Sequence, residues 1–429
     1  MTSITRLACC ALAFHGIVAT SALRADPSAK PGKPAKPAAA AVGGGDPSEA
    51  RARGLTLIRL GKLKEAEAAM KQAAQARGQS IEALYDLARV QFAADDYQKS
   101  RSACRALTVK DKNAMLSDLC MARAFLVWRR ASRATEYVAS ALAKAPNDPD
   151  VVLADADLKR VSGDLEASKA AYQKLLSIAP GDPDASFGLG QLYLIAPDNE
   201  AARRAFAAAL QSAPDWPDAM FELGRLESGT KAVSLLERAI AARPNWPEAR
   251  LALGAARLQN GEIDAAEALF RDVLKANPKL PLAHARLGMA LEAKKDFQGA
   301  ETELKRGLEG LPNDVDAALS LARVYAQTER NEDAFAAYRN ASSLEKTGSL
   351  ALVEAGIFAM KLQRNTLAQA FLEKAVERTP KSAAAQARFA DVLLARGEKA
   401  LAKQHYQMAL GGEGDVDRQD VQRRLAALK

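Results

Sequence analysis

The sequence predicts an all-α protein built from about eleven consecutive pairs of antiparallel helices. Of its 429 residues, 48% are hydrophobic but only 5% are aromatic, which suits closely packed helices better than a β-sandwich or barrel. Prolines recur at positions 146, 180, 214, 244, 278, 312 and 380, in steps of 34 residues with one step of 30 and one of 68. Two columns of small residues share this period, which is typical of a helical repeat array.

The first 25 residues have the layout of a secretory signal peptide. Arg6 precedes an apolar run that reaches Ala22, and the first acidic residue is Asp26. This pattern predicts export, with cleavage near Ala22 or Ala25. The alternatives are an uncleaved membrane anchor, for which the apolar run is short, and an organelle transit peptide.

Residues 26–46 read DPSAKPGKPAKPAAAAVGGGD and are predicted to form a disordered linker. A segment of proline, lysine, alanine and glycine without aromatic residues has no side chains with which to build a core. We expect a solvated spacer. Its lysines leave open a peripheral contact with a negatively charged wall or membrane surface.

The repeats are predicted to start at residues 47, 81, 115, 149, 183, 217, 247, 281, 315, 349 and 383. Their eighth residues are all glycine or alanine: Gly54, Ala88, Ala122, Ala156, Gly190, Gly224, Gly254, Gly288, Ala322, Gly356 and Ala390. The twentieth residues are alanine or serine, and a bulky residue commonly follows four places later. Small side chains allow two helix axes to approach closely, and proline ends the second helix because it cannot continue one.

At these positions the sequence resembles the tetratricopeptide repeat (TPR) family. The best match is Leu189-Gly190-x2-Tyr193, followed by Ala202-x3-Phe206 and Pro214. The resemblance implies a right-handed superhelical solenoid over residues 47–416, and residues 417–429 are expected to form a polar-faced capping helix. It also implies a scaffold that binds other proteins and performs no chemistry.

One repeat, residues 217–246, is four residues shorter than its neighbours. The shortening is expected around Glu227-Ser228-Gly229-Thr230, between its two helices. It leaves open whether the array bends at this repeat or whether the deletion is ordinary loop variation.

Two cysteines, Cys104 and Cys120, follow the leader, which holds the other two. The repeat architecture places them on the second helix of repeat two and the first helix of repeat three, which pack together. In an oxidising compartment we expect a disulfide between them. The alternative is a pair of small buried thiols.

No known catalytic or cofactor motif stands out in the sequence. The chain lacks H-E-x-x-H, G-x-x-x-x-G-K-[ST] and G-x-S-x-G, which mark zinc proteases, phosphate-binding loops and serine hydrolases. Without C-x-x-C, zinc binding and redox catalysis have little support. We therefore expect no enzyme activity, no cofactor and no metal.

The resemblance implies a partner-binding groove formed by the first helix of each repeat. The candidate groove residues are Tyr85, Arg89, Arg123, Phe187, Phe221, Arg225 and Arg323. Such apolar and guanidinium groups suit a protein segment with apolar anchors and acidic residues. Alternatively, the arginines pair locally, as Arg225 with Glu222 or Arg89 with Asp86. Trp216 and Trp246 either offer exposed ligand platforms or fill the junctions between repeats.

The charge distribution suggests a second kind of partner. Residues 47–148 hold eighteen basic and eleven acidic residues, whereas residues 149–216 hold six basic and ten acidic ones. A basic N-terminal end would steer an anionic partner. Our expectation is a scaffold in the bacterial periplasm, in envelope assembly or secretion, with export of an anionic polysaccharide as the alternative. Without interleaved exposed aromatics, nucleic-acid binding is not expected.

Overall fold

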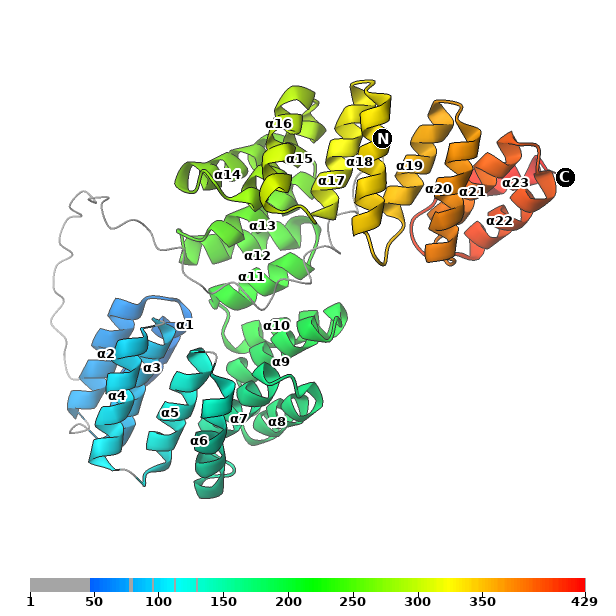
Figure 1. Ribbon diagram of the computed structural model, residues 1–429. Coiled ribbons are helices and arrows are strands. Elements are labelled where there is room, and N and C mark those ends of the chain that lie inside the picture. The colour runs from blue at the N-terminus through cyan, green and yellow to red at the C-terminus, as the bar shows by residue number, and fades with distance from the viewer. Residues whose placement is uncertain (1–46, 77–79, 95, 112, 129, 429) are drawn as a thin grey trace. The chain divides into compact units, whose positions relative to one another are not determined.

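The computed structural model describes residues 47–76, 80–94, 96–111, 113–128 and 130–428 (Figure 1). The predicted leader and linker lie outside these residues. The described chain divides into two compact units, residues 47–252 and residues 253–428.

The first unit contains the helices α1 to α12 and the start of α13. Their bounds are α1 Pro47–Arg59, α2 Leu63–Ala76, α3 Ile81–Ala93, α4 Tyr97–Lys110, α5 Met115–Val127, α6 Ala131–Lys144, α7 Pro149–Val161, α8 Leu165–Ile178, α9 Pro183–Ile195, α10 Asn199–Ser212, α11 Pro217–Leu226, α12 Gly229–Ala242 and α13 Pro247–Gln259.

The second unit begins at Leu253, within α13. Its further helices are α14 Ile263–Ala276, α15 Pro281–Lys294, α16 Phe297–Gly310, α17 Val315–Gln327, α18 Asn331–Leu344, α19 Leu350–Lys361, α20 Asn365–Arg378, α21 Ala383–Ala395, α22 Lys399–Gly411 and α23 Arg418–Ala426. Besides helices and turns, the described residues show one isolated β-bridge, between Ser382 and Glu413. The prediction of an all-α fold is therefore confirmed.

Within each unit, consecutive helices form hairpins that stack in chain order. In the first unit, α1 packs against α2, α3 against α4 and α5 against α6, and the second helices α2, α4, α6, α8 and α10 also contact the first helix of the next hairpin. In both units, first helices additionally touch one another, as α3 touches α5 and α15 touches α17. The first helices therefore line up along one side of each stack, which is where the sequence predicted a groove.

The helix ends follow from the residues at the repeat boundaries. The side chains of Asp148, Asp182 and Asp314 each accept a hydrogen bond from a backbone N–H in the first turn of the helix that follows. This capping satisfies a donor that has no partner inside the helix. Proline stands at the first position of α7 and α9, where its fixed φ angle suits a helix start.

The small eighth residue of the repeat is required by a close approach between the two helices of a hairpin. A Cβ atom added to Gly190 of α9 would lie 2.5 Å from the ring of Phe206 on α10. Phe206 is fully buried, so its ring has little room to move away. The space that the small Gly190 leaves is thus filled by the bulky Phe206, which follows the small Ala202 by four places.

The short repeat loses residues from the end of its first helix as well as from the connection between its helices, where the shortening was expected. Helix α11 has 10 residues, whereas α9 has 13, and α12 begins only three residues after α11 ends. Gly229 at the start of α12 has a φ of 64°, a conformation that favours glycine. The second helix keeps 14 residues, so the change is confined to the end of α11 and the connection.

The last helix, α23, covers the end of the second unit. Its Val421 is 3% exposed. Arg424 of α23 donates to Asp391 of α21 at 2.7 Å, and the Tyr406 hydroxyl of α22 donates to the same carboxylate at 2.6 Å. An apolar contact and a shared acceptor therefore attach α23 to the final hairpin.

One contact in the first unit joins residues far apart in the sequence. The guanidinium group of Arg59, at the end of α1, donates to Asp184 of α9 at 2.6 Å. Its central carbon also lies 5.7 Å from the centre of the Trp216 ring, just before α11. The end of α1 is thereby connected to both ends of the fifth repeat, residues 183–216.

Candidate partner-binding surface

The predicted groove residues all lie on first helices of the hairpins. Tyr85 and Arg89 belong to α3, Arg123 to α5, Phe187 to α9, and Phe221 and Arg225 to α11; Arg323 belongs to α17 in the second unit. The first six therefore share the first unit, whereas Arg323 belongs to the second.

The arginines at the start of the array are bound by acidic side chains. Arg89 and Arg123 both donate to Asp150 at 3.0 Å, and Arg51 donates to Asp86 at 2.6 Å. Asp150 lies in the first turn of α7, so this pairing links three stacked first helices. Burial alone would raise the pKa of Asp150, but attraction to Arg123, Arg89 and Arg51 outweighs burial and holds that pKa below its usual value.

Tyr85 lies at the centre of this charged cluster. Its side chain is 1% exposed, and its hydroxyl is buried without a hydrogen-bond partner among the described residues. Burial raises the pKa of Tyr85 to about 12, so the group is a neutral phenol at physiological pH. Tyr85 is therefore a core residue with an unsatisfied polar edge, rather than the exposed aromatic that a groove position implied.

The aromatic groove residues stack on the two tryptophans. The rings of Phe187 and Trp216 lie 4.5 Å apart, and those of Phe221 and Trp246 lie 4.7 Å apart. Trp216 is 8% exposed. These contacts show that the tryptophans fill the junctions between neighbouring repeats.

Arg225 has the local partner that the sequence suggested, because its guanidinium group lies 3.0 Å from the carboxylate of Glu222. In the second unit, Arg323 donates to Glu354 at 2.9 Å and lies 3.4 Å from Glu292. Glu292 also accepts a hydrogen bond from Ser320. Every groove arginine is thus engaged with a carboxylate of the chain itself.

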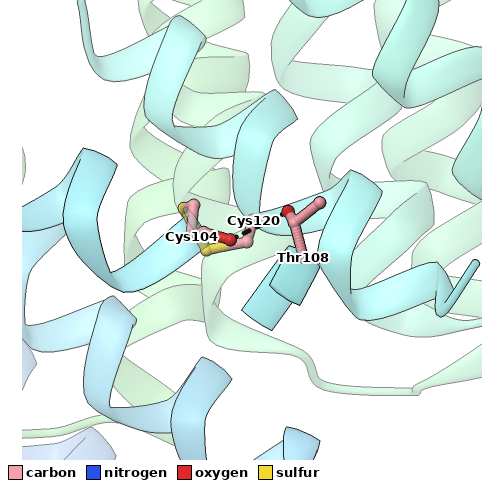
Figure 2. Close-up of a disulfide and its surroundings, with 3 residues drawn as sticks. All are labelled: Cys104, Thr108 and Cys120. Atoms are coloured by element: carbon pink, nitrogen blue, oxygen red, sulfur yellow. Dashed lines mark hydrogen bonds between the residues drawn. A yellow bond between two sulfur atoms is a disulfide. The ribbon is translucent and has the colours of Figure 1, made fainter. Parts of the chain in front are cut away.

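The disulfide lies next to the charged cluster. Cys104 of α4 and Cys120 of α5 are joined, with their Cα atoms 5.4 Å apart, and both are fully buried (Figure 2). The Thr108 hydroxyl donates to the carbonyl of Cys104 at 3.0 Å. The bond fixes the second hairpin to the third, as the sequence led us to expect.

Sequence reasoning found the partner of Arg225 but not that of Arg89, which pairs with Asp150 while Asp86 pairs with Arg51. Asp150 lies 61 residues after its partner Arg89 in the sequence. A signal was present, because the second residue of several repeats is acidic: Glu82, Asp150, Asp184, Asp218, Glu248 and Asp316. A column of acids beside a column of arginines on the same helices would have suggested pairing between repeats.

Among the residues that the structure describes, no three side chains of histidine, cysteine, aspartate or glutamate converge as metal ligands would. In the same residues, no helix combines the length and apolar character that crossing a membrane requires.

Comparison with known proteins identifies the repeat. Two family models, each described as tetratricopeptide repeat, match four segments: residues 57–120 and 226–289 for one, and residues 153–219 and 285–343 for the other. Together these segments span more than half of the chain. No curated protein matches the sequence significantly.

Many solved structures resemble the chain. The crystal structure of yeast Tom70 covers 89% of this chain and 95% of its own, at 13% identity and a TM-score of 0.49. YrrB, described as a TPR protein with an unusual peptide-binding site, covers 42% and 95%, at 24% identity and a TM-score of 0.38. PilF of Pseudomonas aeruginosa covers 42% and 83%, at 22% identity and a TM-score of 0.38. The assignment rests on the repeat models, since none of these TM-scores reaches 0.5.

Proposed function

Because the chain belongs to the tetratricopeptide repeat family, we propose that it is an exported, non-enzymatic scaffold of the bacterial cell envelope. Repeats of this family indicate a scaffold for protein–protein interaction. The envelope location is our inference. It draws on the leader-like pattern of residues 1–25 and on the buried Cys104–Cys120 bond, since disulfides persist in oxidising compartments and are rare in the cytosol.

The disulfide is the observation that carries the proposed location, and an intact mass tests it. We would measure the non-reduced mass of the protein isolated from a fraction of its native host. A mass that begins at Asp26 and lacks two hydrogens supports cleavage, export and the bond together. A full-length mass with both thiols reduced would overturn the proposed location.

We place the partner on the first-helix side of the first unit, together with the corresponding side around Arg323. A protein segment with apolar anchors and acidic residues suits this surface, because its carboxylates would exchange with those that now hold the arginines at about 3 Å. Such an exchange replaces one ion pair with another, so it adds specificity more than affinity.

The groove proposal is tested by removing its arginines. We compare partner recovery by the wild type and by a variant with Arg89, Arg123, Arg225 and Arg323 changed to alanine. A matched control changes Arg105, Arg133, Arg204 and Arg339, which are exposed on second helices. The groove variant should recover less partner than the control. Equal recovery by both variants would exclude the groove arginines from binding.

The basic end of the array favours a second candidate, a factor in export of an anionic polysaccharide. Residues 47–148 carry seven more basic than acidic residues, and such a surface attracts polyanions at low salt. In electrophoresis through gels cast with an anionic polysaccharide, this candidate predicts retardation that salt abolishes. Unchanged migration would leave the protein-binding scaffold as the function.

A further inference from the structure

The end of α1 places a guanidinium group between an acidic residue and a tryptophan of the fifth repeat. Arg59 donates to the carboxylate of Asp184 at 2.6 Å, and its central carbon lies 5.7 Å from the centre of the Trp216 ring. Asp184 is the second residue of this repeat and Trp216 is its last. A carboxylate offers strong hydrogen-bond acceptors and the face of an indole attracts cations, so the two side chains together suit a guanidinium group.

The sixth repeat contains the same pair of side chains. Its second residue is Asp218 and its last is Trp246. Arg243 donates to both oxygens of Asp218, at 3.1 and 3.0 Å, and its central carbon lies 4.4 Å from the centre of the Trp246 ring. A carboxylate, an indole and a guanidinium group thus come together twice in the first unit. The recurrence indicates that the acid and the tryptophan are what select the guanidinium group.

The two repeats differ in where the arginine stands in the sequence. Arg243 lies three residues before Trp246, in the same repeat. The residue three before Trp216 is Ala213, which has no charge. Arg59 takes the corresponding place from the end of α1, in the first repeat. The fifth repeat therefore forms a guanidinium site for which its own sequence supplies no arginine.

Water reaches this site while Arg59 occupies it. The side chain of Arg59 is 24% exposed and that of Asp184 is 28% exposed. An ion pair that water reaches contributes little, because water competes for both charges. Helix α1 itself packs on α2 and α3, so its hairpin keeps these contacts when Arg59 leaves Asp184. Another guanidinium group can therefore replace that of Arg59 without unfolding either helix.

The site borders the surface on which we place the partner. The ring of Trp216 also lies 4.5 Å from that of Phe187, a candidate groove residue. Asp184 precedes Phe187 by three residues on α9, and residues at this spacing are neighbours on one face of a helix. A segment bound next to Phe187 can therefore reach Asp184 with a long side chain.

We propose that Asp184 and Trp216 bind an arginine side chain of the partner segment, and that Arg59 occupies their site until the partner displaces it. The proposal rests on the scaffold function above, because it assigns a subsite to the same partner. Arginine suits the site better than lysine, since a planar guanidinium group both stacks on a ring and donates two hydrogen bonds to one carboxylate. The partner segment then carries acidic residues for the groove arginines and one arginine for this site.

Arg59 is an internal competitor in this arrangement. The partner's arginine binds only those molecules in which the site is vacant, so the apparent affinity falls by that fraction. Removing Arg59 should therefore strengthen binding at the site. A residue that merely supported the fold would weaken binding when removed, so the sign of the effect distinguishes the two roles.

The site is tested with two small probes on the full-length, oxidised protein. N-acetylarginine methylamide carries the guanidinium group, and N-acetyllysine methylamide carries the same charge without it. Each probe is titrated by fluorine NMR into protein labelled with 5-fluorotryptophan, and the Trp216 signal is assigned by its loss in Trp216→Phe. Arg59→Ala should bind the arginine probe about threefold or more tighter than wild type does, and tighter than the lysine probe by a similar factor.

Further variants locate the binding. Arg53→Ala is the matched control, because Arg53 is an exposed arginine of the same helix, and it should bind like wild type. Adding Asp184→Asn to Arg59→Ala should remove the gain. Circular dichroism verifies folding, and Arg59→Gln, which keeps part of the side chain, should behave as Arg59→Ala. No gain in either Arg59 variant, a gain that survives Asp184→Asn, or equal binding of the two probes would overturn the proposal.

Partner recovery separates this proposal from the scaffold function. Arg59→Ala should recover more partner than Arg53→Ala, and Asp184→Asn should recover less. Equal recovery by these three variants would refute a partner arginine at the site, and a loss of recovery in the groove variant would still leave the scaffold function standing. Equal recovery by the groove variant and its control would instead count against the groove, whereas the probe titration needs no partner and stands by itself.

Discussion

At Gly190 the hairpin of α9 and α10 leaves no room for a side chain. We expect Gly190→Val to destabilise the protein by about 1–3 kcal/mol, as overpacking of a core does, because its Cβ would lie 2.5 Å from the Phe206 ring. Gly411→Val is the control, since nothing lies within 4 Å of its added Cβ. Urea unfolding measures both. A Gly190→Val midpoint equal to that of the control would show that the hairpin tolerates a wider spacing.

Asp150 makes a pH-dependent contribution to stability. Its pKa is lowered in the folded protein because the attraction of Arg123, Arg89 and Arg51 exceeds the opposing effect of burial. The stabilisation is therefore complete above the usual carboxyl pKa of about 4 and is lost as the pH falls through the lower folded value. We expect Asp150→Asn to cost about 1–3 kcal/mol at pH 7, with a smaller difference from wild type at pH 3.

Urea unfolding of wild type and Asp150→Asn at both pH values measures this effect. Glu200→Gln provides the comparison, because Glu200 pairs with Arg203 but is 71% exposed. Exposed pairs contribute about 0–1 kcal/mol. A difference between wild type and Asp150→Asn that is the same at pH 3 and pH 7 would contradict a lowered pKa in the folded state.

At the scale of the elements, the Cys104–Cys120 disulfide links α4 to α5. Closing a loop between residues 16 apart in the sequence should stabilise the folded state by about 3 kcal/mol. We expect reductant to lower the urea midpoint of the wild type. The double variant Cys104→Ser, Cys120→Ser should start at the lower midpoint and not respond to reductant. A wild-type midpoint that is insensitive to full reduction would refute this contribution.

The elements also show what the sequence predicted and what it did not. Each predicted repeat start lies within one residue of a first-helix start, because prolines, caps and small residues act within one hairpin. The small and bulky columns predicted a close approach of the two helices, but not that the Phe206 ring would lie directly against Gly190. The pairing of Arg89 with Asp150 was missed, because a contact between hairpins depends on how far each is shifted and turned relative to the next.

For the molecule as a whole, stacking in chain order predicts that a destabilising substitution affects mainly the hairpin that carries it and the helices next to it. Leu304 of α16 is fully buried, so Leu304→Ala should cost about 2–5 kcal/mol through the cavity it leaves. Because α16 packs on α15 and α17, hydrogen exchange should accelerate mainly in these three helices. Amides of α21 and α22 should exchange nearly as in the wild type. Uniform acceleration throughout residues 253–428 would show that this unit unfolds as one body.

The contact of Arg59 with Asp184 and Trp216 gives the first unit a different character. In a stack held by contacts between neighbours alone, a terminal hairpin can unfold without changing the stability of hairpins that it does not touch. Here loosening of α1 also removes a charge partner from α9, 125 residues away in the sequence. The pair thus couples the first hairpin directly to the fifth, so that loosening of either one weakens a contact of the other.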